Sequence, residues 1–291
     1  MRSGEAARRP ESLTARQAGS ARPAYDAGAI LGLDHVTLAV AALEPALATY
    51  STVFGRPADA RGEAQGLSWA RFRLANTNLV LVAPAGAPGD LAAHLAGRRE
   101  GEGAALGALA FGVSDPESAA RLLDRRGLPA AGAPQPWLGR PATPLARAAS
   151  RGLHLLLTSP DPSPRPEDAP RLDHLVIRSG DPERSIALLA GRLGLDLRLD
   201  RSNPDWGQRL LFIRCGDLVL EVSHALGAGP SEEPDRLWGI TWGVPDVEGW
   251  RARLEAAGIP VSPLRTGRKP GTRIFTIRDH AAGVPTAFIG G

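Results

Sequence analysis

Short runs of alternating hydrophobic and polar residues, separated by segments with a helical pattern, recur in the same order four times along this chain. The repeat is clearest at the start of each half, where LDHVTLAV at 33–40 returns as LDHLVIRS at 172–179. A proline-rich, acidic stretch, DPSPRPEDAP at 161–170, separates the halves and is poorly suited to a strand or a helix. The pattern therefore predicts two related domains joined by a linker.

Each half divides again into two modules. Four helix-like segments follow the first strand-like run of a module, and each ends on a glycine suited to the left-handed conformation there: Gly55, Gly127, Gly194 and Gly258. In the third module three alternating runs follow the helix. The module is therefore βαβββ, and the fold class is α+β. We expect a disordered extension at 1–30, a first domain at 31–160 and a second at 171–291.

Composition narrows the classes of function. The 34 basic and 31 acidic residues nearly balance, and the basic ones, nearly all arginine, do not gather into a stripe for nucleic acid. No apolar run approaches the roughly 18 residues of a membrane span, and the single cysteine, Cys215, fits a reducing compartment. We expect a soluble cytoplasmic protein, a monomer or a homodimer, that binds a small molecule and has neither nucleic-acid nor membrane partners.

The alternation also indicates which side chains face a ligand, because successive residues of a strand point to opposite faces of the sheet. If the apolar residues of 33–40 lie in the core, His35 points to the other face. The same argument places His154, His174 and Glu221 on that inner face. The remaining inward positions are small and leave room for a ligand: Ala108, Ala110, Gly112, Gly239, Thr241 and Gly243.

The LDHV and LDHL starts, GDLVLEV at 216–222 and VPDVEGWRARLEAAGIPV at 244–261 resemble the vicinal oxygen chelate superfamily. That superfamily includes glyoxalase I, bleomycin-resistance proteins and extradiol dioxygenases. The resemblance covers residues 31–291 and implies two domains with curled mixed sheets around cavities. It also implies, for members that bind a divalent metal, ligands from the first and fourth strands of two modules.

Carried onto this sequence, the resemblance implies four possible metal ligands: His35, His154, His174 and Glu221. Which of them meet depends on how the modules pair, and the sequence leaves two arrangements open. If modules one and two pair, His35 meets His154, and the ligand set of a dioxygenase is incomplete because Gly239 and Ala287 occupy two of its positions. If modules two and three pair, His154, His174 and Glu221 form a two-histidine, one-carboxylate set.

Two functions follow from the resemblance. The first is a glyoxalase-like lyase or isomerase, in which His154, His174 and Glu221 hold Zn, Ni, Mn, Fe or Co and Glu221 moves a proton of a small oxygenated metabolite. The second is a metal-free binding protein of the bleomycin-resistance kind. Candidate substrate-binding residues are Arg209, Thr241 and Arg273.

Structural roles are the alternative for several of these residues. The histidines could hydrogen-bond within the sheet without a metal, and His35 is the weaker metal candidate. Glu221 could pair with Arg178 or Arg214, because a buried carboxylate needs a partner. The alternation places Trp238 and Trp242 in the core.

Overall fold

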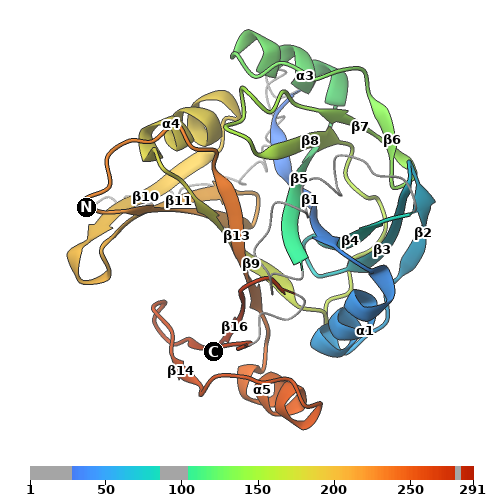
Figure 1. Cartoon of the computed structure of the whole chain (residues 1–291), viewed down its shortest axis with the longest axis vertical. Coiled ribbons are helices and arrows are strands. Elements are labelled where there is room, and N and C mark those ends of the chain that lie inside the picture. Colours follow the sequence, from blue (N-terminus) through green and yellow to red (C-terminus); the bar gives the residue numbers. More distant parts are fainter. Residues whose placement is uncertain (1–27, 86–103, 279–282) are drawn as a thin grey trace, which may run out of the picture.

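The computed structural model describes residues 28–85, 104–278 and 283–291, and it contains two curled sheets with helices on their outer faces (Figure 1). The α+β fold of four βαβββ modules is confirmed. The expected extension at 1–30 lies outside the described residues except at its end, where the first strand begins at Ile30.

The first two modules contain these elements: β1 (Ile30–Val40), α1 (Leu43–Phe54), β2 (Ala60–Ala64), β3 (Leu67–Arg73), β4 (Asn78–Pro84), β5 (Ala104–Val113), α3 (Pro116–Arg125), β6 (Gln135–Trp137), β7 (Arg140–Pro144) and β8 (His154–Thr158). The last two contain β9 (Arg171–Arg178), α4 (Pro182–Ile186), the π-helical η2 (Ala187–Arg192), β10 (Asp196–Asn203), the 3-10 turn η3 (Pro204–Trp206), β11 (Gln208–Cys215), β12 (Leu218–Ala225), β13 (Arg236–Gly243), α5 (Val247–Ala256), β14 (Arg265–Thr266), β15 (Arg273–Thr276) and β16 (Thr286–Gly290).

The two central strand pairs decide how the modules combine. β1 pairs with β4 of its own module in parallel and with β5 of the second module in antiparallel fashion. β9 pairs in the same way with β12 and β13. The strand orders are therefore β2-β3-β4-β1-β5-β8-β7-β6 and β10-β11-β12-β9-β13-β16-β15-β14. Modules one and two share the first sheet, and modules three and four share the second.

The expected helical segments begin and end at the predicted signals. The carboxylates of Asp115 and Asp246 accept backbone N–H groups at the starts of α3 and α5, which satisfies donors that have no partner within the helix. The four glycines predicted to end the segments have φ from 66° to 78°, the left-handed conformation. The third segment differs, since α4 continues as the π-helical η2. No helix in the described ranges is long and apolar enough to cross a membrane.

The two domains share one hydrophobic core, formed where the helix-bearing faces of the sheets meet. The ring of Phe54 at the end of α1 packs edge-on against Trp242 of β13, with ring centroids 5.2 Å apart. Arg253 of α5 donates to the carbonyls of Thr52 at 2.6 Å and Val53 at 2.8 Å, the C-terminal end of α1. Because these contacts join modules one and four, the domains pack as a single unit.

Trp242 lies in the core as the alternation predicts, but Trp238 does not. Trp238 is 40% exposed, and the guanidinium of Arg178 lies 4.2 Å from its ring centroid. The register of β13 on β9 shifts between Leu237 and Gly239, and such a bulge breaks the alternation of faces. The expectation of a core position for Trp238 is therefore wrong.

Replacing Trp242 by alanine should lower the free energy of unfolding by about 3–5 kcal/mol, because it removes a fully buried aromatic side chain between the domains. Urea unfolding followed by circular dichroism measures this change. Trp238→Ala is the matched control and should cost about 1 kcal/mol or less, as is usual for exposed positions. Equal losses in the two variants would contradict the shared core.

Candidate functional site

The strand registers bring several predicted residues onto the inner face of the first sheet. His35 lies opposite Asn78 of β4 and Ala110 of β5, and Ala108 lies opposite His154 of β8. His35 and His154 are therefore on the same sheet, two residues out of register. This is the arrangement in which modules one and two pair.

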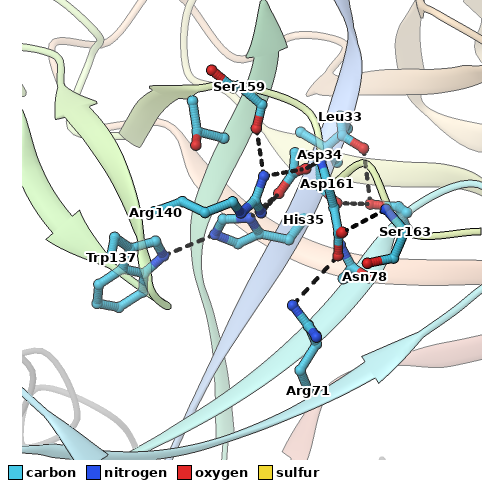
Figure 2. A network of polar contacts seen from close by, with 12 residues as sticks. Leu33, Asp34, His35, Arg71, Asn78, Trp137, Arg140, Ser159, Asp161 and Ser163 are labelled. Carbon is cyan, nitrogen blue, oxygen red and sulfur yellow. Dashed lines mark hydrogen bonds and ion pairs between the residues drawn. The ribbon is translucent and has the colours of Figure 1, made fainter. Parts of the chain in front are cut away.

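Both ring nitrogens of His35 are engaged (Figure 2). The indole Nε1 of Trp137 donates to His35 Nε2 at 2.9 Å, and His35 Nδ1 lies 2.7 Å from the Asp34 carboxylate. Because an indole N–H can only donate, Nε2 is the acceptor and Nδ1 carries the proton. His35 is 1% exposed, and the lone pair of its Nε2 accepts the indole N–H of Trp137, so it is not available to a metal. His35 therefore has the structural role that was the alternative to metal binding.

Asp34 is the centre of this network (Figure 2). Arg140 donates to both of its carboxylate oxygens, at 3.1 Å and 2.6 Å, and the backbone N–H of Asp161 donates to it at 2.7 Å. Burial alone would raise the pKa of Asp34, but hydrogen bonds from His35 and Arg140 outweigh burial and hold the pKa well below its ordinary value. The carboxylate is therefore ionised and fixes the start of the linker.

The linker is held by further arginines of the first sheet. Arg71 and Arg73 of β3 lie 3.4 Å and 3.6 Å from the Asp161 carboxylate. Arg165 donates to the side-chain oxygen of Asn78 at 2.9 Å. On the inner face Thr37 and Val80 are buried, whereas Ala108 and His154 are partly exposed. This face serves to fasten the linker.

The second sheet presents a different inner face. His174 of β9 lies opposite Val219 of β12 and Thr241 of β13, and Glu221 lies opposite Val176 two positions along β9. His174 and Glu221 therefore lie diagonally adjacent on one face. The His174 side chain is 23% exposed, and its Nδ1 lies 2.9 Å from the Asp173 carboxylate.

Glu221 has no hydrogen-bond partner within the described ranges. The two arginines expected to pair with it are engaged elsewhere: Arg178 stacks on Trp238, and Arg214 donates to the Gly216 carbonyl at 2.9 Å. Glu221 is partly exposed rather than buried, so water can solvate its carboxylate. Its charge is available to a ligand.

Apolar side chains flank this carboxylate. Leu199 of β10 and Phe212 of β11 lie opposite each other, and Phe212 also lies opposite Glu221. Leu199 is 47% exposed. At the edges of the sheet Trp206 is 40% exposed, with the guanidinium of Arg268 3.5 Å from its ring centroid. The second sheet thus offers an accessible apolar surface beside the carboxylate of Glu221.

The three-ligand metal set expected from the sequence is not assembled. His154 is on the first sheet, whereas His174 and Glu221 are on the second, because each sheet combines consecutive modules. Across the described ranges no group of three or more His, Cys, Asp or Glu side chains could hold a metal ion. Thr241 and Ala287, which pair beside His174, supply no imidazole or carboxylate. These residues do not fit a metal held by three protein ligands.

The two arginines predicted to bind substrate lie on the helix-bearing face. On β11, Arg209 is an odd number of positions from Phe212, so the two side chains point to opposite faces of the sheet. Arg209 pairs with Glu183 of α4 at 2.7 Å. Arg273 of β15 pairs with Glu248 of α5. Neither arginine lies on the inner face. Thr241 does lie there, opposite His174, as the alternation predicts.

Sequence reasoning missed the acidic partners of the histidines and the residues that complete the Asp34 network. A signal for the former was present, since LDH brings Asp34 and Asp173 into the repeat. The sequence contains no comparable signal for Trp137 and Arg140, because they lie in the proline-rich segment around β6 and β7, where no alternation of hydrophobic and polar residues is visible.

A family model described as the Glyoxalase/Bleomycin resistance protein/Dioxygenase superfamily matches residues 32–140 and 171–288. A variant of 4-hydroxymandelate synthase from Streptomyces coelicolor is similar with a TM-score of 0.70 and 13% identity, over 90% of this chain and 92% of that one. No protein with a curated description matches the sequence.

Two dioxygenase structures are also similar. A variant of homoprotocatechuate 2,3-dioxygenase from B. fuscum has a TM-score of 0.64 and 18% identity, over 92% of this chain and 73% of that one. A halotolerant catechol dioxygenase has a TM-score of 0.63 and 12% identity, over 91% and 88%. At such identities the likeness shows the fold alone.

Replacing Asp34 by asparagine should lower the free energy of unfolding by about 3 kcal/mol at pH 7, because it leaves Arg140 without its buried partner. The folded-state pKa of Asp34 is depressed, so its stabilisation is present above the unfolded-state pKa of about 4 and is lost as pH falls further. The difference between wild type and Asp34→Asn should therefore narrow below about pH 4.

Urea unfolding at pH 7 and pH 3 measures this difference. The matched control is Asp124→Asn, at an exposed position of α3, which should change stability little at either pH. A difference that stays constant down to pH 3 would show that Asp34 is not held ionised as described.

Proposed function

Because the chain belongs to the Glyoxalase/Bleomycin resistance protein/Dioxygenase superfamily, we propose that it binds a small oxygenated molecule on the inner face of its second sheet. The observation that carries the proposal is the contrast between the two inner faces. On the first, His35 is bonded at both nitrogens and Val80 is buried. On the second, His174 and Glu221, at the corresponding strand positions, are partly exposed.

The chemistry of this face suits a ligand with an apolar body and a hydroxyl group. Leu199 and Phe212 would contact the apolar part, and burial of their exposed surface would favour association. The Glu221 carboxylate would accept a hydrogen bond from the hydroxyl, and the partly exposed His174 lies diagonally adjacent to it. Glu221 is also the group that would accept a proton if the bound molecule reacts.

Binding is proposed to be independent of a metal. His174 and Glu221 are the two metal-ligand candidates on this face, and the side chains paired with them are Val219, Thr241 and Val176. A stable divalent centre in proteins commonly has three or four protein ligands. The function is therefore closer to the bleomycin-resistance kind than to a glyoxalase-like lyase or isomerase.

Metal analysis of protein expressed with added Zn, Ni, Mn, Fe and Co tests this point. We expect no stoichiometric metal after dialysis. About one ion per chain, lost in His174→Ala and retained in His224→Ala, would contradict metal-independent binding and restore the lyase or isomerase hypothesis.

Binding of hydroxylated aromatic fragments, catechol among them, can be followed by the fluorescence of Trp206 and Trp238, which are both exposed near this face. We expect saturable quenching in the wild type and roughly ten- to a hundredfold weaker binding in Glu221→Gln, since a hydrogen bond to a charged group contributes about 1.5–3 kcal/mol. Glu255→Gln, on the outer face of α5, is the control. No saturable binding of any fragment, or equal affinity in the two variants, would refute the proposed site.

A further inference from the structure

A groove with a volume of about 600 Å³ lies between the two domains, away from both inner faces. The loop at 147–152, which precedes β8, forms one wall. The helical segment at 184–192 and the loop at 232–234 form the other. Figure 1 shows α4 beside the helix and strands of the second module. Ligand sites occur preferentially at domain interfaces, and this volume is in their usual range.

Two arginines in the groove have no carboxylate partner within the described ranges. Arg147 donates to the carbonyl of Gly152 at 3.2 Å, and Arg192 donates to the carbonyl of Ala149 at 2.8 Å. A carbonyl oxygen satisfies an N–H group but leaves the charge of the guanidinium uncompensated. Backbone carbonyls of the first domain therefore hold the guanidinium groups of Arg147 and Arg192 at one groove.

The other charged residues of the groove are largely matched. Arg151 pairs with Asp235 at 3.2 Å, and Arg184 pairs with Glu232. Glu233 also lines the groove, and its backbone carbonyl accepts from Arg151 at 3.1 Å. Asp181 also pairs with Arg184, at 3.2 Å, so of the four arginines that line the groove only Arg147 and Arg192 have no carboxylate partner in the described part of the chain.

The backbone is irregular on both walls. Arg151 has a φ of 55°, a left-handed conformation that is uncommon for a residue with a side chain. On the opposite wall the helix is π-helical over Ala187–Arg192, and such turns occur frequently at functional sites. Hydrogen bonding holds Arg151 in place, since the N–H of Asp235 donates to its carbonyl at 2.8 Å. Strained backbone that the surroundings hold in this way is characteristic of ligand sites.

We propose that this groove is a second binding site, for a small molecule that carries an oxyanion, either a carboxylate or a phosphate. The guanidinium groups of Arg147 and Arg192 would bind the oxyanion, since their planar forks match both groups. Ala149, Ala187 and Pro234 would contact the remainder of the molecule. The site is independent of the function proposed above, because no residue of the second inner face lines it.

Isothermal titration calorimetry with inorganic phosphate and with acetate, at constant ionic strength set with sodium chloride, tests the site. We expect saturable binding of at least one of these anions to the full chain. Arg147→Gln and Arg192→Gln should each weaken it about tenfold, the usual effect of one charge-assisted hydrogen bond. A response to phosphate alone would assign the site to phosphorylated molecules, and a response to acetate alone would assign it to carboxylates.

The matched control is Arg278→Gln, because Arg278 also donates to a backbone carbonyl, that of Val261 at 3.1 Å, but lies outside the groove. It should bind anions as the wild type does. If Arg192→Gln fails to fold, the exposed Arg147 decides the question alone. Absence of saturable binding, or equal affinity in all three variants, would overturn the proposal. Either result leaves catechol binding at the second inner face unaffected.

Discussion

The antiparallel pairing of the first strands of consecutive modules is the constraint on which the rest of this structure depends. β1 pairs with β5, and β9 pairs with β13, so each sheet is formed by two consecutive modules. This pairing places His154 with His35 and keeps both from His174. A metal centre built from modules two and three is thereby excluded, although each of its three residues points to an inner face. Topology, rather than the choice of residues, decides which side chains can act together.

The two related domains place different interactions at the same strand positions. In the first domain an ionised, buried Asp34 orients His35 and Arg140 and fastens the linker, and breaking such a buried network is costly. In the second, Asp173 holds His174 in the same way, but no arginine or indole completes a network among the described residues. The first face therefore contributes stability and the second remains accessible to a ligand.

Much of this could be predicted from the sequence. The four modules follow from the repeated LDH and the four glycines that end the helices. The inner positions of His35, His174 and Thr241 follow from the alternation of side chains along each strand. Module pairing could not be predicted, because it is set by strand contacts between segments distant in sequence, β1 with β5 and β9 with β13. The face of Trp238 was missed because a bulge leaves no mark in the alternation. The ion pairs of Arg209 with Glu183 and of Arg273 with Glu248 could not be predicted, because these partners are distant in sequence.

The central claim is that ligands bind at the second inner face and not at the first. The most direct test is nitrogen-15 NMR of the histidine imidazoles during titration with a fragment that quenches tryptophan fluorescence. We expect the resonances of His174 to shift with saturation, whereas those of His35 stay unchanged with Nδ1 protonated. A shift of His35 with no change at His174 would contradict it.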